Sequence, residues 1–436
     1  MNSIENIAPK GQLKRVVIVG AGFAGLKLAR KLPQNQFQVV LIDKNNYHQF
    51  QPLFYQVATA GLEPSSISFP LRKALHKRKN IHIRTAQAQN IDVANHQLLT
   101  DIGSVNYDYL VLALGADTNY FNMVNIAQNA IPMKSVTEAL YLRNTILQNF
   151  EDALNTTDPN ELAALMNIIV VGGGPTGVEL AGAIAEMKKH VLPKDYPELD
   201  FTRMHIYLVE SSDKVLGVMS SQAAYKAHQY LTKLGVEVLT NVAVKDYDGH
   251  CASLANGQEI YARTLLWAAG IKANSILGLP NTVYGRGGRL ITDAFNAVQG
   301  YPDIFALGDM ALTPDDKYPN GHPQVAPVAI QQADNLAKNL VRMQKQQNLL
   351  PFKYVNQGSL ATIGRNLAVA DLPSFKLRGF LAWILWLFVH LMSIVGVKNR
   401  LFIFINWAWS YFTYDQSLRL LIKPYTKQKM NQNQSQ

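Results

Sequence analysis

Two glycine-rich turns are the features of this chain whose residue types and spacing most directly predict chemistry. The first, at 20–25, reads GAGFAG, and the second, at 172–177, reads GGGPTG, so both have the pattern Gly-x-Gly-x-x-Gly. In such a turn the first glycine permits a tight bend, the second lets the backbone approach a pyrophosphate, and the third lets a helix pack closely on a strand. Free amides at the N-terminus of that helix favour a phosphate. The sequence therefore predicts two dinucleotide sites.

The first turn has the context that the motif requires. It follows the apolar run 16–19 and precedes a helical pattern, and the next predicted strand ends in Asp43, 23 residues after Gly20. A carboxylate at this point can accept hydrogen bonds from ribose hydroxyls. The residues expected to hold the first dinucleotide are Gly20, Gly22, Phe23, Ala24, Gly25, Asp43 and Lys44.

The second turn repeats this arrangement with a longer interval. The apolar run 168–171 precedes it, and the following strand ends in Glu210, 38 residues after Gly172, with the extra residues expected in a loop at 188–204. An acid at the end of that strand with no arginine beside it favours NAD over NADP, because it would repel a 2′-phosphate. The residues expected to bind the second dinucleotide are Gly172, Gly174, Pro175, Thr176, Gly177, Glu179 and Glu210.

Glu179 is the candidate catalytic residue, two positions after Gly177 and expected on the first turn of the second dinucleotide helix. In a partly desolvated pocket its carboxylate could orient a nicotinamide or relay a proton, because burial raises the pKa of a carboxyl group. The alternative is a structural glutamate that stabilises the helix dipole. The residues alone leave both interpretations open.

The composition excludes several kinds of redox chemistry. Cys251 is the one cysteine of the sequence, so an internal disulfide, a cysteine zinc site and an iron–sulfur cluster held by the chain's own thiolates are excluded. The ten histidines show no helical pairing with acids, so no metal site is expected. No secretory or presequence pattern precedes the first strand, and the body of the protein is expected in the cytoplasm.

The tail carries much of the positive charge and most of the tryptophan. The net charge is +10, and from Phe375 onward eight basic side chains stand against the single acid Asp415. Four of the five tryptophans also lie there, at 383, 386, 407 and 409. Basic residues beside tryptophan-rich apolar segments are typical of an anionic lipid surface. We therefore prefer a lipid surface to nucleic acid as the partner of this tail.

The apolar part of the tail falls into two blocks. Residues 379–397 form a 19-residue run without charge, long enough for a membrane span but interrupted by His390 and Ser393. Residues 401–414 form a shorter block whose helical length, roughly 21 Å, cannot cross a core of about 30 Å. A polar stripe runs along one side of this block, at Asn406, Ser410, Thr413 and, just beyond it, Ser417. It predicts a helix lying in the membrane interface with its aromatic face toward lipid. Whether 379–397 spans, and whether the tail instead forms a dimer interface or a core subdomain, stays open.

Four further stretches carry a resemblance to a known family. They are YDYLVLALGADTN (107–119), TLLWAAGIKAN (264–274), YPDIFALGDMA (301–311) and the loop NNYHQFQPLFYQVATAGLEP (45–64). With the two glycine turns, they make the chain resemble the glutathione reductase-like flavoproteins, and within them the type II NADH dehydrogenases. The resemblance implies an α/β fold with two Rossmann-like dinucleotide-binding domains and a C-terminal helical membrane-anchoring region. It implies an FAD-binding domain at 12–122 and 271–340, an NADH-binding domain at 123–270 and an anchoring domain at 341–436.

The resemblance also assigns further residues. It adds Gly115, Asp309 and Ala326 to the site of a non-covalently bound FAD, and Ala269 and Gly270 to the site of the substrate NADH. The helix that follows 323 is similar to the quinone-site helix of this family, written A-Q-x-x-x-Q. Gln331 and Gln332 match that motif, whereas Pro327 occupies the place of its first glutamine.

The function that the resemblance implies is NADH:quinone oxidoreduction without proton pumping. A hydride would pass from NADH to FAD N5, and two electrons would then pass to a membrane quinone, with Glu179 near both substrates. The enzyme would lie on the cytoplasmic face of the cell membrane, held through residues 379–414; a homodimer is left open. The alternatives are a soluble NAD(P)H reductase serving a ferredoxin-like acceptor and a non-enzymatic flavoprotein, because fold alone does not fix function.

Overall fold

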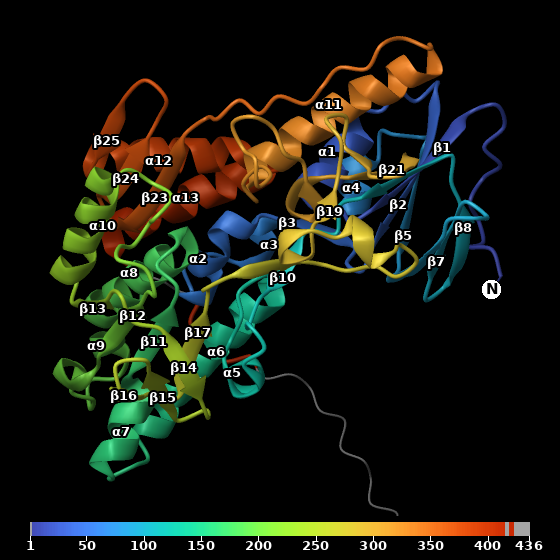
Figure 1. Ribbon diagram of the computed structural model, residues 1–436. Helices are drawn as coiled ribbons and strands as arrows, with labels where there is room; N and C mark the ends of the chain where they lie inside the picture. Colours follow the sequence, from blue (N-terminus) through green and yellow to red (C-terminus); the bar gives the residue numbers. More distant parts are fainter. Residues whose placement is uncertain (1, 415–417, 423–436) are drawn as a thin grey trace, which may run out of the picture.

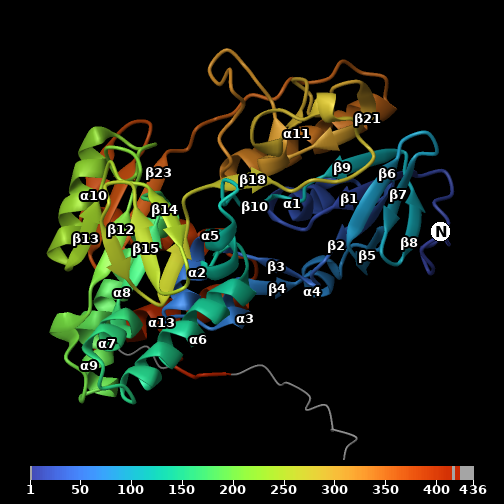
Figure 2. The same cartoon turned by 60° about the horizontal axis from the view of Figure 1, so that its bottom comes forward.

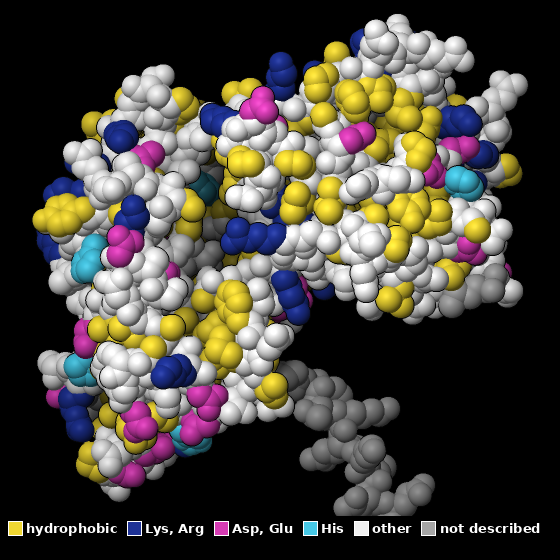
Figure 3. Space-filling model, viewed as in Figure 1, with side chains coloured by type: hydrophobic (Ala, Val, Ile, Leu, Met, Phe, Trp, Pro, Cys, Tyr) yellow, Lys and Arg dark blue, Asp and Glu magenta, His cyan; other side chains and the backbone are white. Residues whose placement is uncertain are grey.

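Two α/β lobes and a C-terminal layer that joins them make up the molecule, described here from a computed structural model (Figure 1). The structure describes residues 2–414 and 418–422. One face of the molecule is hollowed between the lobes (Figure 3). The expected α/β architecture with two dinucleotide-binding lobes is confirmed.

The first lobe is built on a six-stranded sheet with the order β20-β21-β9-β1-β2-β5, parallel except at β20. Strands β1 and β2 are buried along most of their length, which explains their continuous apolar runs. Helices α1 and α11 pack together on one face, and the small sheet β6-β7-β8 covers the other. The strands are β1 (Lys14–Val19), β2 (Phe37–Asp43), β5 (Ile81–Thr85), β6 (Ala88–Asp92), β7 (Gln97–Thr100), β8 (Gly103–Asn106), β9 (Tyr109–Leu112), β20 (Ala297–Val298) and β21 (Tyr301–Ala306); the helices are α1 (Phe23–Lys31) and α11 (Ala326–Gln344).

The second lobe repeats the plan with a parallel sheet of order β13-β12-β11-β17. The long interval before Glu210 holds α9 (Leu192–Asp195) and a short 3-10 helix (Phe201–Arg203), as the surplus of residues predicted. The main elements are β11 (Ile168–Val171), β12 (Ile206–Val209), β13 (Val236–Leu239), β17 (Thr264–Trp267), α6 (Val136–Ala153), α7 (Pro159–Met166), α8 (Pro175–His190) and α10 (Ser221–Lys233). A second sheet comprises β14 (Val244–Tyr247), β15 (Cys251–Leu254) and β16 (Glu259–Tyr261), beside which α5 (Val124–Asn129) lies.

The chain passes between the lobes through an antiparallel pair, β10 (Ala116–Thr118) and β18 (Ile271–Ala273). The segment at 47–70 also leaves the first lobe, because its helix α2 packs against α6 and α8. This segment comprises β3 (Tyr47–Gln49), a 3-10 turn (Gln51–Leu53), α2 (Phe54–Ala58), α3 (Pro64–Ile67) and β4 (Ser68–Pro70), and α4 (Leu71–Leu75) follows it. The shortest remaining pair is β19 (Leu290–Ile291) with β22 (Ala311–Leu312).

The C-terminal layer consists of the sheet β23 (Ser359–Gly364), β24 (Leu367–Asp371) and β25 (Lys376–Arg378), followed by α12 (Phe380–Ser393) and α13 (Val397–Thr413). Strand β23 lies so close to α8 that a side-chain carbon at Gly182 would fall 1.7 Å from the Ile363 carbonyl oxygen. Helix α13 runs beside α3 (Figure 2). Within 2–414 and 418–422, no helix combines the length and the apolar character needed to cross a membrane.

Candidate functional site

The first glycine turn has the geometry of a phosphate cradle. Gly20 has a φ of 100°, and a side-chain carbon there would lie 2.2 Å from the Ala113 carbonyl oxygen. At Gly25 such a carbon would lie 1.8 Å from the Gly20 carbonyl oxygen, so both positions require glycine. At Gly22, by contrast, no described atom other than those of Gly22 and its chain neighbours lies within 4 Å of such a carbon. Gly22 therefore leaves open the space in front of α1 that a pyrophosphate would take.

A cleft of about 310 Å³ opens from this turn along the first lobe. Asp43 and Lys44 line it at the end of β2, and Gly115 lines it where the chain leaves for the second lobe. The Asp43 carboxylate accepts the N–H of Ala21 at 2.6 Å and of Asn45 at 2.7 Å. Burial raises the pKa of Asp43, and these two hydrogen bonds oppose the rise. The carboxylate is thus held at the cleft wall.

Asp309 and Lys134 carry opposite charges, and each favours the charged form of the other. Burial raises the pKa of Asp309, and the positive charges of Lys134 and Arg289 oppose that rise. Burial also lowers the pKa of Lys134, with Asp309 as the largest opposing charge. Lys134 lines the cleft but belongs to no motif, so nothing in the sequence indicated it.

The second glycine turn repeats the cradle in the other lobe. Gly172 has a φ of 108°. At Gly174, in front of the helix that begins at Pro175, no described atom beyond the chain neighbours lies within 4 Å of a side-chain carbon. The Glu210 carboxylate accepts the N–H of Gly173 at 2.5 Å and of Ser212 at 2.7 Å. Burial would raise the pKa of Glu210, but these hydrogen bonds and the neighbouring serine hydroxyls hold it below its ordinary value. Glu210 is thus kept ionised at the end of β12.

Three other residues expected to bind a nucleotide lie close to the second glycine turn. Ala269 and Gly270 lie in the turn after β17, which ends at Trp267, and the Gly270 carbonyl oxygen accepts the N–H of Asn119 at 3.0 Å. The α-carbon of Ala269 would lie 2.8 Å from a side-chain carbon at Gly172, so it borders the second turn. Thr176 is the second residue of α8.

Glu179 is the fifth residue of α8, and the first turn of that helix contains no acid. The expectation of a first-turn glutamate acting on the helix dipole is therefore wrong. The side chain is 7 % exposed, and its Oε1 accepts the Trp386 indole N–H at 3.2 Å and the Thr362 N–H at 3.4 Å. Burial raises the pKa of Glu179 to about 8, while these two hydrogen bonds act to lower it. The side chain therefore holds a proton near neutral pH.

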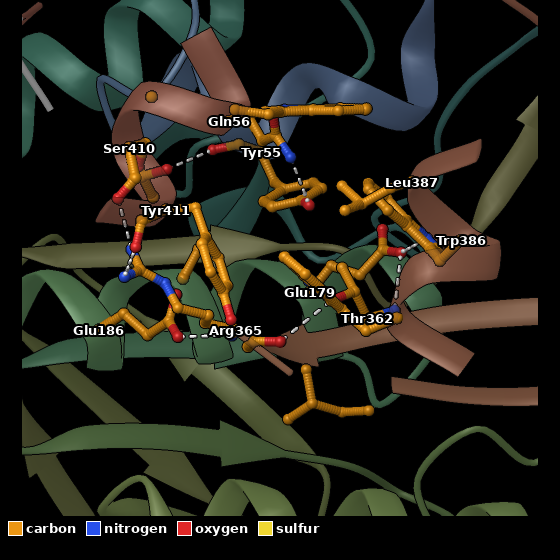
Figure 4. A pocket seen from close by; sticks show the side chains of 17 residues that line it. Tyr55, Gln56, Glu179, Glu186, Thr362, Arg365, Trp386, Leu387, Ser410 and Tyr411 are labelled. Atoms are coloured by element: carbon orange, nitrogen blue, oxygen red, sulfur yellow. Dashed lines mark hydrogen bonds between the residues drawn. The ribbon is translucent and has the colours of Figure 1, made fainter. Parts of the chain in front are cut away.

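Glu179 lines a cavity of about 110 Å³, here named the Glu179 cavity, which five separate parts of the chain enclose. Its walls come from α2 and the turn after it, α8, β23 with Arg365, α12 and α13. Glu179, Trp386 and Thr362 lie on one side, Glu186 and Arg365 on the other, and Tyr55 and Gln56 between them (Figure 4). Glu186 accepts the Arg365 N–H at 2.6 Å, and burial raises its pKa. Of these residues only Glu179 was expected in a site; Trp386 was expected at a lipid surface, and Tyr55 and Gln56 belong to the stretch 45–64 that carries the family resemblance.

The two glutamines of the expected quinone motif are engaged elsewhere. Gln332 is fully buried, and its Oε1 accepts the Gly308 N–H at 2.7 Å, beside Asp309. Gln331 exchanges two 3.0 Å hydrogen bonds with the backbone of Val355. Pro327 follows Ala326 at the start of α11. None of these four side chains is among those lining the Glu179 cavity, so the structure does not bring them together with Glu179.

The outer sides of α12 and α13 form a surface that we call the apolar helix face. Its members are exposed by 44 % or more: Phe380, Leu381, Ile384, Phe388 and Met392 on α12, and Val397, Leu401, Phe402, Phe404, Ile405, Trp409 and Phe412 on α13. Asn406 and Ser410 of the expected polar stripe are only partly exposed, whereas Ser417 lies outside the described residues. Helix α13 thus presents its aromatic side outward, opposite to the usual orientation of a surface helix.

Within the described ranges, no three His, Cys, Asp or Glu side chains are grouped so that they could hold a metal ion. Each lobe thus has a glycine turn in front of a helix and a carboxylate at the end of the next strand, which is the arrangement of a dinucleotide-binding domain. Residues 14–333 match the family described as pyridine nucleotide-disulphide oxidoreductase, and residues 356–413 match the NDH2 C-terminal domain. The chain belongs to the type II NADH:quinone oxidoreductases.

Individual relatives agree with this assignment. The chain is 34 % identical to the type II NADH:quinone oxidoreductase Ndh of Mycobacterium tuberculosis, covering 92 % of this chain and 88 % of that one. It is 35 % identical to NdhA of the same organism, with the same two coverages. Among solved structures, NDH2 of Plasmodium falciparum in complex with NADH matches with a TM-score of 0.87 over 94 % of this chain and 100 % of that one, at 22 % identity. At that identity the match supports the fold.

Proposed function

We propose that this NADH:quinone oxidoreductase holds FAD in the cleft of the first lobe, binds NADH at the second glycine turn and receives its quinone in the Glu179 cavity. The observation that carries the proposal is the position of this cavity. It lies between α8, which begins at the NADH turn, and the two helices that bear the apolar helix face. Electrons from a water-soluble donor could therefore reach a lipid-soluble acceptor at this place.

The residues of the first lobe fit FAD. The open space at Gly22 suits a pyrophosphate, the Asp43 carboxylate suits a ribose, and Gly115 and Lys44 line the remaining cleft. Bound FAD would supply the two-electron carrier between NADH and quinone. Gly20, Phe23, Ala24, Gly25, Asp309 and Ala326 complete the proposed site. Because the sequence has one cysteine, we expect electrons to leave without a dithiol relay.

The second lobe is proposed to bind NADH through its backbone amides and one carboxylate. The pyrophosphate would lie at Gly174 and the start of α8, with Pro175, Thr176 and Gly177 beneath it. Glu210, held ionised, would accept the ribose hydroxyls and repel a 2′-phosphate. Ala269 and Gly270 would border the nicotinamide side.

Glu179 is proposed to supply the proton that the reaction consumes. The conversion of NADH, a quinone and one proton to NAD⁺ and a quinol takes that proton from solution. A carboxyl group with a pKa of about 8 is protonated at neutral pH and can donate to the quinone oxygen. Gln331, Gln332 and Pro327 on α11 are still proposed as quinone residues; because none of them lines the Glu179 cavity, they would contact a part of the quinone outside it.

The membrane side of the proposal rests on the apolar helix face. Tryptophan and phenylalanine side chains exposed on two adjacent helices favour the lipid interface, and nearby lysines and arginines favour anionic lipid. We propose attachment to the cytoplasmic face of the cell membrane through residues 379–414. The proposed division is an FAD domain at 12–122 and 271–340, an NADH domain at 123–270 and an anchoring domain at 341–436. Helix α11 crosses the boundary at 340 and ends at Gln344.

A steady-state assay of the purified protein tests the function. The expected result is rapid oxidation of NADH with a short-chain quinone, slower oxidation of NADPH, and FAD released on denaturation. Activity only with a ferredoxin-like carrier would replace this function with that of a soluble reductase. Bound FAD with no turnover on any acceptor would favour a non-enzymatic flavoprotein.

A further inference from the structure

A tyrosine hydroxyl in the wall of the Glu179 cavity has its proton available for a ligand. Tyr55 Oη accepts a hydrogen bond from Gln56 Nε2 at 2.8 Å, and Tyr55 is 7 % exposed. Within the described ranges, the Tyr55 hydroxyl donates to no other residue. A hydroxyl group can donate once while it accepts. The hydroxyl thus offers one hydrogen-bond donor inside the cavity.

Trp407 decides which way the Gln56 amide points. The indole Nε1–H of Trp407 lies 2.7 Å from Gln56 Oε1, and an indole N–H can only donate. Gln56 must therefore present its carbonyl oxygen to Trp407 and its NH₂ group to Tyr55. A donor facing the tyrosine oxygen occupies a lone pair of that oxygen. The Tyr55 proton is consequently directed away from Gln56.

The surroundings keep that proton on the tyrosine. Burial and the nearby Glu179 raise the pKa of Tyr55 well above its ordinary value. The Tyr55 ring also meets the Trp386 ring edge-on, with centroids 6.3 Å apart, and Trp386 is the residue that donates to Glu179. Trp386 therefore contacts both Tyr55 and Glu179.

We propose that the Tyr55 hydroxyl donates a hydrogen bond to a carbonyl oxygen of the quinone, and that Gln56 and Trp407 are positioning residues for it. This inference rests on the proposed function, because it assumes that quinone enters the Glu179 cavity. The proton stays on Tyr55 throughout, so the step is binding and charge stabilisation only. The donor stabilises the negative charge that grows on the quinone oxygen as electrons arrive.

The test compares Tyr55→Phe with the intact protein, using NADH and a short-chain ubiquinone analogue. Loss of one buried hydrogen bond is expected to raise the quinone KM by about tenfold. The rate at which NADH bleaches the flavin, and turnover with ferricyanide, which has no carbonyl oxygen, should not change. Tyr225→Phe is the matched control, because the Tyr225 hydroxyl also accepts a glutamine amide, from Gln229 at 2.7 Å, but is 62 % exposed on α10.

Gln56→Leu and Trp407→Phe separate positioning from a structural effect. Each should raise the quinone KM less than Tyr55→Phe does, and adding Gln56→Leu to Tyr55→Phe should cause no further rise. An unchanged quinone KM in both Tyr55→Phe and Gln56→Leu would overturn the inference, as would an equal loss with ferricyanide. If the intact protein itself reduces no quinone, the proposed function fails instead, so the two failures are distinguishable.

Discussion

Two glutamates of the NADH lobe lie in environments that move their pKa values in opposite directions. Glu179 is enclosed by α8, β23 and α12, where burial outweighs two hydrogen bonds and raises its pKa to about 8. Glu210 sits at the end of β12, where burial acts to raise its pKa but the hydrogen bonds from Ser212, Gly173 and Ser211 together outweigh it and lower the pKa. One residue is thereby suited to carry a proton and the other to repel a phosphate.

The raised pKa of Glu179 makes stability depend on pH. Its carboxyl holds a proton up to about pH 8 in the folded protein but loses it near the ordinary value of 4.5 when unfolded. The folded state then binds more protons, so this contribution to stability is lost as the pH rises between these values. The thermal stability of Glu179→Gln, relative to that of the intact protein, should therefore be higher at about pH 9 than at about pH 5. Thermal unfolding at both pH values measures this, with Glu198→Gln as an exposed control; a difference that is the same at both would contradict it.

Glu210 should set the preference between the two nicotinamide cofactors. Glu210→Gln removes the negative charge but keeps an oxygen that can accept the Gly173 N–H, so the turn should survive. The ratio of kcat/KM for NADH to that for NADPH is expected to fall by roughly tenfold, about 1.4 kcal/mol. Steady-state kinetics with both cofactors check this, and an unchanged ratio would place the discrimination elsewhere.

At the scale of single elements, local sequence patterns predicted the strands, the two turns and the amphipathic α13, because each depends on neighbours in the chain. Local patterns could not show the partner of a side chain where that partner is distant in the chain. Gln331 and Gln332 fit a quinone motif by spacing, yet the structure engages them with Val355 and Gly308. The uncharged run 379–397 is likewise broken after Ser393, and α13 begins only at Val397. Nothing in the local pattern encodes these partners.

Arg365 ties the end of α13 to the body of the protein. Its Nη1 and Nη2 donate to the carbonyl oxygens of Tyr411 at 2.8 Å and Ser410 at 2.9 Å, and its guanidinium lies 3.5 Å from the centre of the Tyr414 ring. A cation at a helix C-terminus also favours the helix dipole. Arg365→Met should loosen this end of α13 by about 1.5 to 3 kcal/mol.

Hydrogen exchange measures this loosening as faster amide exchange over 405–414, with α1 unchanged. Arg84→Met is the matched control, because Arg84 Nη2 also donates to two backbone carbonyls, of Glu5 at 2.9 Å and Asn6 at 2.7 Å, at the other end of the molecule. If exchange in α13 is equal in Arg365→Met and the intact protein, the helix end is held by its other contacts.

At the scale of the whole molecule, the Glu179 cavity could not be read from the sequence. Tyr55, Glu179, Arg365, Trp386 and Trp407 are spread over more than 350 positions and meet only when both lobes and the C-terminal layer have packed. Trp386 illustrates the cause. Because it is a tryptophan in the basic, apolar tail, it was expected at a lipid surface. The residue is instead 1 % exposed and belongs to the largest hydrophobic core of the described residues. The same local sequence pattern fits an aromatic side chain buried in the core and one exposed to a membrane.

The apolar helix face should bind membrane by insertion rather than by charge alone. Salt screens attraction between exposed basic side chains and anionic lipid, but it does not weaken burial of aromatic side chains. The intact protein should therefore stay on anionic vesicles at about 1 M salt, where the Debye length is about 3 Å. Phe404→Glu with Trp409→Glu, which are 55 % and 63 % exposed, should release it.

Vesicle sedimentation measures this binding, with Val218→Glu as the control because Val218 is 85 % exposed on the NADH lobe. Point changes serve better than a chain stopped near Ser374, which would also remove Trp386 from the core and so confound unfolding with release. Release of the intact protein by salt would show that charge alone holds it. Retention of the double variant would place the membrane contact on another surface, and the Glu179 cavity would then lack a direct route for quinone from lipid.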